Sequence, residues 1–410
     1  MSLNEKKAVD IMKKSSGKNI IAESLTTIPH GFFAAIKDSD EVILVTDGPC
    51  AFADKLECIR DEYRYTARIR FAKMNAKNSQ ALRFFIKWTA PSSCGKEVQS
   101  IGFEDDCNML LSFAAQDLSG ENIKPVICSE TKTAQELAVN MGNSAWQAFC
   151  SGLKTGYGAE YSYAKTEPEI MNALLCGYTG IVLDVAEKIN AAALEMPIEE
   201  IKNQFEKQPE DFREAINFSY KDKSFDMDEN LLLSYEESDL WRICICYGEL
   251  IAFLQYVYNA YFKGAPWPVD FVISFADREL SPKAHYLIAN ELQRAGVNVC
   301  AVEIAPDSMH FAGNCKVAAK MPHKIRLLAD NEKPFDLKDA KCLFDLRPAK
   351  GSGLKFLRKI LEDNNDPCAE LFKNTDSIDM EKIKEAIKKY PNDCKDLMQK
   401  QLQLQKNLLK

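Results

Sequence analysis

The feature that most limits the fold of this chain is a repeated succession of short apolar runs, each followed by a segment of helical periodicity. Several runs are apolar on both faces, as strands of a parallel sheet covered by helices are. Strands that alternate with helices predict a parallel α/β sheet. The runs are EVILV (41–45), ARIRFA (67–72), KPVIC (124–128), TGIVLD (179–184), PVDFVISF (268–275), VNVCAVEI (297–304), HKIRLL (323–328) and KCLFDL (341–346).

Eight or nine strand candidates fit a closed (β/α)-barrel, and an open doubly wound sheet stays open on the pattern alone. The chain has 410 residues, which suits one barrel with insertions. We predict a TIM-like (β/α)-barrel, irregular in places. Its expected parts are an N-terminal α/β segment packed on the barrel (1–95), the barrel itself (96–365) with a helical insertion at about 186–232, and a C-terminal helical tail (366–410).

Local signals predict where several helices begin and end. A helix is expected from Thr133 to Leu153. Pro168 between two glutamates predicts the start of another, which ends at Gly177. A third helix opens at Ser281 and ends near Gly296, the position where a left-handed cap is usual.

Composition excludes several classes of protein. The net charge is −8, so no basic face for nucleic acid is expected. The 14 cysteines include no CxxC pair and are expected to be reduced thiols rather than zinc ligands. The N-terminus lacks the apolar region of a signal peptide, and the apolar stretches are shorter than a membrane span. We therefore expect a cytoplasmic protein that contacts neither membrane nor nucleic acid.

Polar residues near the predicted strand ends are the candidates for chemistry, because a barrel places its site at the C-terminal ends of its strands. Each of them can equally be a helix cap or a loop charge, the commoner role for any single residue. Several acids at successive strand ends favour a pocket without naming a reaction. The candidates are Asp184, Asp277, Glu303, Asp330, Asp345 and Arg347.

Metal and phosphate motifs are weak. The four histidines form no HExxH or HxH pair, and each is expected to be a surface or structural residue. Residues 156–160 and 347–353 are predicted to form glycine loops, and the second carries two cations before a predicted helix. That arrangement suits an anion, although a plain strand-to-helix turn explains it equally well.

Two segments, GYGAEYSYAKTEPEI (156–170) and GYTGIVLD (177–184), resemble the bacterial tagaturonate epimerases. Further segments are similar in the family's order, so that the resemblance covers residues 100–361 in patches. It implies a (β/α)-barrel enzyme of hexuronate metabolism that uses a divalent metal. The further segments are SIGFEDD (100–106), residues 269–297, HKIRLLADNEK (323–333) and residues 342–361.

The chain departs from this family at the metal centre. Tyr163, Lys188 and Leu328 stand where the family has histidines. At the end of the strand over residues 269–275 the family has an acidic cluster. Here Phe275 stands at that place, and only Asp277 is acidic. The resemblance therefore implies the fold and part of the substrate-facing shell, while we expect the metal centre to be lost.

The candidate roles combine the strand ends with this resemblance. As catalytic residues we predict Asp184, Asp277 and Asp105. As substrate-binding residues we predict Lys333, Arg347, Lys350, Ser352 and Glu160. No metal ligand is assigned, and no cofactor is expected beyond a hydrated divalent cation held weakly by Asp184 and Asp277.

Two functions stay open on the sequence. The first is epimerisation or isomerisation of a sugar acid, with a lysine or arginine holding the enolate or the substrate carboxylate. The second is a non-catalytic homologue that binds a small anion or a protein through the inherited pocket.

Overall fold

The structure, a computed structural model, describes residues 3–64, 66–104, 122–130, 133–275, 278–321, 323–329, 341–348 and 359–366, with scattered residues between 389 and 403. Eight parallel strands close into a barrel in the order β12-β13-β14-β15-β6-β7-β8-β9. The predicted (β/α)-barrel is confirmed, and the open sheet is excluded. The strands are β6 (Gln99–Glu104), β7 (Ile123–Ser129), β8 (Gly158–Ala164), β9 (Gly180–Asp184), β12 (Asp270–Ser274), β13 (Val299–Glu303), β14 (Lys324–Ala329) and β15 (Phe344–Pro348).

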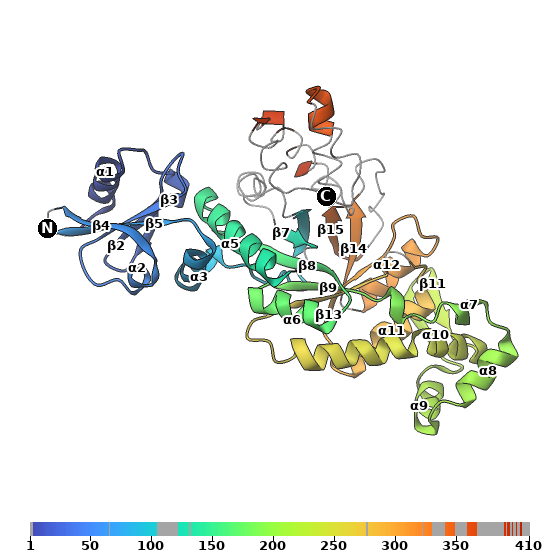
Figure 1. Cartoon of the computed structure of the whole chain (residues 1–410). Helices are drawn as coiled ribbons and strands as arrows, with labels where there is room; N and C mark the ends of the chain where they lie inside the picture. The colour runs from blue at the N-terminus through green and yellow to red at the C-terminus, as the bar shows by residue number, and fades with distance from the viewer. Residues whose placement is uncertain are drawn as a thin grey trace.

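Helices follow the strands and cover the outside of the barrel (Figure 1). Apolar residues of these helices pack with the outward side chains of the strands into one large core. Because the strands are covered outside and filled inside, most of their residues are apolar on both faces. The covering helices are α5 (Ala134–Ser151), α6 (Glu167–Cys176), α10 (Glu237–Val257), α11 (Pro282–Arg294) and α12 (Phe311–Lys320).

The predicted helix ends are confirmed by their caps. Thr133 accepts a hydrogen bond from the Glu136 N–H at the start of α5, and Gly152 ends that helix in the left-handed region. α6 begins with a capping box and ends at Gly177, which has φ 94°. These ends are set by local hydrogen bonds, so short-range sequence signals find them.

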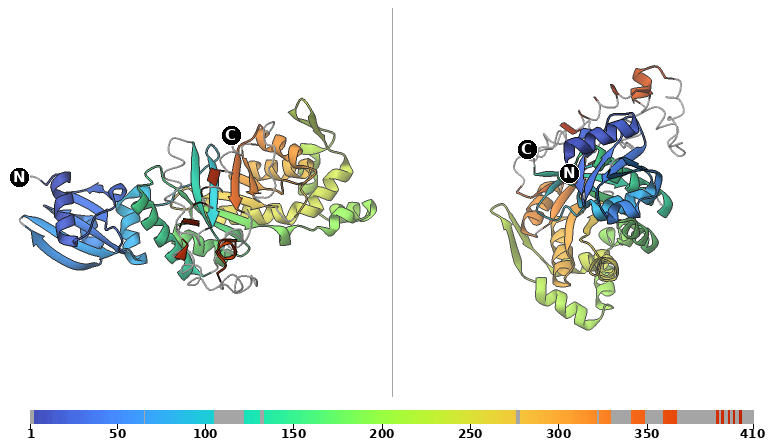
Figure 2. Two further views of the ribbon diagram at one scale, coloured as in Figure 1. Left: turned by 90° about the horizontal axis from the view of Figure 1, so that it is seen from above. Right: turned by 90° about the vertical axis from the view of Figure 1, so that its left-hand side faces the viewer.

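A five-stranded antiparallel sheet precedes the barrel, in the order β1-β2-β3-β5-β4. It forms one end of the molecule (Figures 1 and 2). Phe33 of this sheet stacks on Phe149 of α5 with ring centroids 4.6 Å apart, so the sheet packs on a barrel helix. The elements are α1 (Glu5–Ser16), η1 (Ala22–Ser24), β1 (Thr26–Ile28), β2 (Gly31–Ala35), β3 (Glu41–Thr46), α2 (Ala51–Lys55), β4 (Cys58–Arg64), β5 (Ala67–Lys73), α3 (Ala76–Phe85) and η2 (Lys87–Thr89).

The segment predicted as a helical insertion is only partly helical. Its last part forms an antiparallel hairpin rather than a helix. The hairpin strands have only five and four residues, too few for a strand period to be recognised in the sequence. The segment comprises η3 (Ala186–Lys188), α7 (Ala192–Glu195), α8 (Ile198–Glu206), α9 (Glu210–Tyr220), β10 (Ser224–Asp228) and β11 (Leu231–Ser234).

One helical stretch, Glu237–Phe262, is long and apolar enough to cross a membrane by length and composition. The expectation that every apolar stretch falls short of a span is therefore wrong for this one. The stretch comprises α10 and the π-helical turn η4 (Tyr258–Phe262). Leu240, Leu250 and Leu254 of α10 are fully buried in the barrel core, which accounts for the apolar composition.

Candidate functional site

The barrel interior holds two layers of charged side chains. Alternate residues of a strand point to one face, so Lys324 and Arg326 both enter the barrel while Ile325 and Leu327 join the outer core. We call the layer near the N-terminal strand ends the floor, comprising Ser100, Lys124, Asp270, Lys324 and Asp345. We call the layer nearer the C-terminal ends the arginine layer, comprising Glu160, Tyr163, Ser274, Glu303, Arg326 and Arg347.

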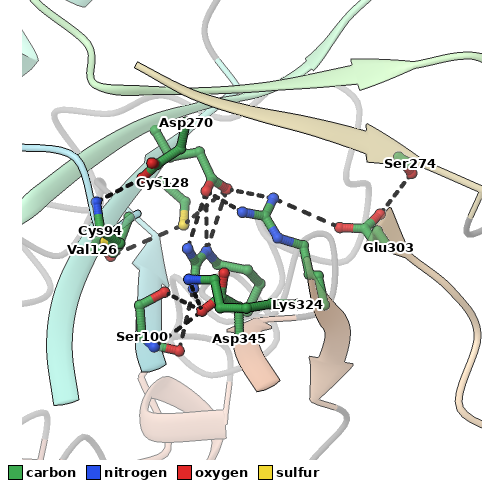
Figure 3. Close-up of polar contacts among 12 residues, drawn as sticks. Cys94, Ser100, Val126, Cys128, Asp270, Ser274, Glu303, Lys324 and Asp345 are labelled. Carbon is green, nitrogen blue, oxygen red and sulfur yellow. Dashed lines mark hydrogen bonds and ion pairs between the residues drawn. The ribbon is translucent and has the colours of Figure 1, made fainter. Parts of the chain in front are cut away.

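The floor connects residues 93–95, which precede the first barrel strand, to the strands through hydrogen bonds. Asp270 accepts hydrogen bonds from Ser93 Oγ (2.6 Å), the Cys94 N–H (2.7 Å) and the Gly95 N–H (2.9 Å). Lys124 Nζ donates to the Ser93 carbonyl at 2.9 Å. These bonds close the N-terminal end of the barrel, and Figure 3 shows the one between Cys94 and Asp270.

A buried ion pair completes the floor. Lys324 Nζ lies 2.8 Å from Asp345 Oδ1 and donates to the Val98 carbonyl at 2.9 Å. Ser100 Oγ donates to the same carboxylate at 2.8 Å. Burial alone would raise the pKa of Asp345, but the charge of Lys324 and the nearby arginines holds that pKa below its ordinary value. Both charges of this pair are therefore neutralised within the floor.

The arginine layer is built on one carboxylate shared by two guanidinium groups. Arg326 binds both oxygens of Glu160, with Nη1 2.9 Å from Oε1. Arg347 Nη2 lies 3.1 Å from Glu160 Oε2. Gly102 leaves room for this arrangement, because a Cβ there would overlap the Arg347 side chain. Burial alone would raise the pKa of Glu160, but the two arginines lower it, so Glu160 stays ionised.

Glu303 provides the second carboxyl group of the layer. It is the last residue of β13, 1% exposed, and accepts a hydrogen bond from Ser274 Oγ at 2.7 Å. Its carboxylate is 3.9 Å from Arg326 Nη1. Burial raises the pKa of Glu303, more than the Arg326 charge lowers it. Burial therefore favours the neutral form of Glu303. In that form, two guanidinium groups face one ionised carboxylate, and the layer carries one excess positive charge.

Tyr163 enters the same layer through a strained turn of the backbone. It has φ 61°, and the pairing of β8 with β9 shifts between Tyr161 and Ala164. A bulge of this kind redirects a side chain, and bulges often lie beside functional sites. The Tyr163 hydroxyl hydrogen-bonds to Glu303, and burial raises the pKa of the tyrosine. Tyr163 and Glu303 are thus neighbours in the layer, and burial favours the protonated form of both.

The structure brings Glu160 and Arg347 together, whereas the described side-chain contacts of Asp184 are with other residues. Asp184 ends β9, lies 3.1 Å from Lys165 Nζ and accepts the Ala186 N–H at 3.1 Å. Glu160 lies on strand β8, so the prediction of a glycine loop over residues 156–160 is wrong from Gly158 onward. The other predicted site residues lie outside the described residues: Asp105, Asp277, Asp330, Lys333, Lys350 and Ser352.

One strand-end candidate is corrected. Asp345 is the second residue of β15, so it belongs to the floor rather than to the C-terminal end. That strand was predicted to end at residue 346, whereas it runs to Pro348. Lys324 and Arg326 were not among the predicted site residues. Their spacing of two within KIRLL, between apolar neighbours, is the signal that places both inside a barrel strand.

The described residues do not fit the family's divalent metal. The Tyr163 hydroxyl is engaged by Glu303. Lys188 Nζ lies 3.6 Å from Glu249 Oε1, on α10, so this side chain is directed away from the barrel interior. Phe275 packs in the outer apolar core. Among the residues that the structure describes, no three His, Cys, Asp or Glu side chains gather as a metal site requires.

Two histidines have the structural role predicted for them. His285 Nε2 lies 2.9 Å from His323 Nε2, and His285 Nδ1 lies 3.1 Å from Asn314 Oδ1. Burial lowers the pKa of His285 to about 4. The pair joins α11, α12 and the start of β14 outside the barrel interior.

Comparisons with known proteins agree with this architecture. A family model described as tagaturonate epimerase matches residues 21–316. The native crystal structure of fructuronate-tagaturonate epimerase from Cohnella laeviribosi is 19% identical, with a TM-score of 0.77 and 99% of both chains covered. A structure of the same enzyme complexed with two glycerols is 21% identical, with a TM-score of 0.74, covering 96% of this chain and 89% of that one.

No curated protein sequence matches the chain significantly. At such identities the crystal structures support the fold alone. The family model carries the assignment, because it spans more than half of the sequence and includes the N-terminal sheet and six of the eight barrel strands. The chain therefore belongs to the tagaturonate epimerase family.

Proposed function

We propose that this protein is a cytoplasmic, epimerase-like barrel that binds and acts on a sugar acid of the hexuronate class, without a tightly bound metal. The observation that carries the proposal is the excess positive charge of the arginine layer. Arg326 and Arg347 share the single ionised carboxylate of Glu160, while burial favours the neutral form of Glu303. A site with one surplus guanidinium charge suits a ligand with one carboxylate.

One donor in this layer supports the same interpretation. Arg326 is 1% exposed at its side chain, and its Nε has no hydrogen-bond partner among the described residues. A buried donor without a partner is costly, so a bound acceptor would recover part of that cost. A carboxylate or hydroxyl oxygen of a sugar acid supplies such an acceptor.

Epimerisation of a sugar acid needs a base, a proton donor and a group that holds a developing oxyanion. In this proposal a guanidinium of the arginine layer holds the oxyanion, and the hydrogen-bonded pair of Glu303 and Tyr163 carries the proton. Asp184 is the described candidate for the base. The candidates beyond the described residues keep their proposed roles, with Asp277 and Asp105 as acid or base and Lys333, Lys350 and Ser352 at the substrate.

A second function is favoured by the altered metal positions. Tyr163, Lys188 and Leu328 cannot reproduce an imidazole ligand set, so the barrel can have kept binding while losing the reaction. The protein would then be a non-catalytic homologue that binds a small anion or a protein partner. This alternative predicts hexuronate binding without turnover, or no hexuronate binding at all.

Calorimetric titration tests the binding step. Fructuronate and tagaturonate should bind, while the neutral sugars fructose and tagatose should not, because only the acids carry the carboxylate. Replacing Arg326 or Arg347 by methionine should weaken hexuronate binding by roughly tenfold or more. Arg83→Met is the matched control, since Arg83 is a largely buried arginine outside the barrel interior that bonds the Cys176 carbonyl. Failure of both acids to bind would reject the proposal.

Turnover and metal content separate the two functions. After exhaustive dialysis against a chelator, interconversion of the two hexuronates is followed by NMR, and zinc, manganese and iron are measured per chain. Turnover without stoichiometric metal, reduced by Glu303→Gln and by Asp184→Asn, supports the enzyme. Binding without turnover supports the non-catalytic homologue. About one retained metal ion per chain would contradict the metal-free part of the proposal.

A further inference from the structure

The N-terminal sheet ends in an open edge strand. β4 pairs only with β5, its seven residues form the edge of the sheet, and six of them are exposed. Ile59 is 53% exposed and Tyr63 is 71% exposed. At the opposite edge, β1 has only three residues. Long open edges are a liability that proteins usually protect, and a long edge with exposed apolar residues invites another strand.

The hairpin shows which backbone groups of β4 are open. Arg64 pairs with Ala67, and only two residues of the sequence separate them. The last pair of so short a hairpin exchanges backbone hydrogen bonds. From Arg64 towards Cys58, hydrogen-bonded and non-hydrogen-bonded residue pairs alternate along the strand. Asp61 and Tyr63 thus direct their N–H and C=O groups outward, away from β5.

We propose that β4 pairs antiparallel with β4 of a second copy of this chain, about a two-fold axis at Asp61. The charge order of the strand, Cys-Ile-Arg-Asp-Glu-Tyr-Arg, is complementary to itself in that register. Arg60 faces Glu62 of the second copy, and Glu62 faces its Arg60. Ile59 lies opposite Tyr63 of the second copy, which covers the two exposed apolar side chains.

Other symmetric registers either place like charges opposite each other or pair much less of the strand. Because β4 has only seven residues, an axis at Ile59 or at Tyr63 leaves three residues of each strand overlapping, whereas the axis at Asp61 pairs all seven. Because the open backbone groups belong to Asp61 and Tyr63, the axis must pass through a residue rather than between two. An axis at Arg60 opposes two arginines, and an axis at Glu62 opposes two glutamates. Both would occupy non-hydrogen-bonded positions, where opposed side chains are closest and like charges repel most.

The charges already present on β4 fit the register at Asp61. Two Asp61 carboxylates would approach across the axis, but each is neutralised by Arg68 of its own chain, whose Nε lies 3.0 Å from both Asp61 oxygens. Glu62 Oε1 is enclosed and has no hydrogen-bond partner among the described residues. The facing Arg60 would supply a cation to that carboxylate.

The edge also carries features that prevent indiscriminate pairing. Its charges are unfavourable for an apolar strand, and a β-bulge interrupts the pairing with β5 between Cys58 and Arg60. These features exclude general aggregation while leaving the self-complementary register available. The edge is therefore a surface selective for a second copy, at the end of the molecule away from the insertion helices (Figures 1 and 2).

Sedimentation velocity of the full chain over a range of concentrations tests the proposal. The wild-type protein should form a dimer. Arg60→Glu and Glu62→Arg should each raise the dimer dissociation constant by roughly tenfold or more, because two-fold symmetry turns two attractive pairs into two repulsive ones. The double variant R60E/E62R restores the complementarity and should restore dimerisation.

A matched control separates this effect from a general one. Glu214→Arg makes the same charge reversal on exposed α9 and should leave the dissociation constant unchanged. Circular dichroism of each variant checks that the sheet still folds. A wild-type protein that is monomeric throughout overturns the proposal. So does a dimer that E62R leaves intact, or one that the double variant fails to restore.

Discussion

The floor and the arginine layer use the same residue types inside one barrel, yet they are built differently. In the floor, Asp270 receives three hydrogen bonds, and Lys324 is matched by Asp345. In the arginine layer, Arg326 and Arg347 compete for Glu160, and Arg326 Nε has no partner among the described residues. A buried charge that is fully matched holds the fold together, whereas one that is incompletely matched is available to a ligand.

The largest expected effect on stability comes from removing a charge from the floor. Lys324→Met leaves Asp345 buried without its cation and should lower the free energy of unfolding by about 3–5 kcal/mol. Denaturant unfolding measures this loss. The double variant K324M/D345L removes both charges and should recover much of the stability. A loss below about 1 kcal/mol in K324M would mean that the floor is not a structural layer.

Asp270→Asn should have the next largest effect. The amide keeps one acceptor oxygen for three donors, so bonds to Ser93, Cys94 and Gly95 compete for it. We expect a loss of about 2–3 kcal/mol, since hydrogen bonds to a charged group are stronger than neutral ones. Denaturant unfolding is again the measurement. Unchanged stability would show that the entering chain is held by other contacts.

Glu303→Gln tests how the ionisation of Glu303 in the arginine layer affects stability. The pKa of Glu303 is higher in the folded than in the unfolded protein. The shift therefore stabilises the folded protein fully at pH values below the unfolded-state pKa. This stabilisation is lost as the pH rises through the folded-state pKa. The variant should therefore be more stable than wild type at pH 8, by on the order of 1 kcal/mol. The difference should vanish near pH 4.

The same variant tests the charge excess. As pH rises, ionisation of Glu303 cancels the surplus positive charge, so hexuronate affinity of the wild-type protein should fall. With glutamine at this position the affinity should no longer depend on pH in that range. An identical pH dependence in both proteins would assign the effect to another group.

The smallest expected effect again concerns the floor. Ser93→Ala removes one of three donors to Asp270 and leaves the two backbone N–H groups in place. The expected loss is about 1 kcal/mol. Comparison with Asp270→Asn on the same unfolding curve gives the contribution of the carboxylate itself. If Ser93→Ala lowered the free energy of unfolding more than Asp270→Asn does, the carboxylate would not be the main contributor to this contact.

The candidate site was only partly predictable. Glu303 and Arg347 were found as polar residues at predicted strand ends, and Glu160 within the segment that resembles the epimerase family. All three lie in the arginine layer. Asp184 was found for the same reason, yet its described contacts are Lys165 and the Ala186 N–H. A strand-end position is a local property, whereas the partner of a buried charge comes from another strand. That difference explains both the successes and the misses.

The sequence by itself determined six of the eight barrel strands and the helix ends, because periodicity and capping act over a few residues. Apolar runs predicted these six strands but not β6 or β8, and the runs at 41–45 and 67–72 belong to the N-terminal antiparallel sheet. Thr133, Gly152 and Gly177 stand at helix ends. The tertiary structure alone decided which inward charges meet. Glu160 and Arg326 are 166 residues apart and pair only because β8 and β14 face each other across a closed barrel. Strand register and barrel closure set such distances, and no local pattern carries that information.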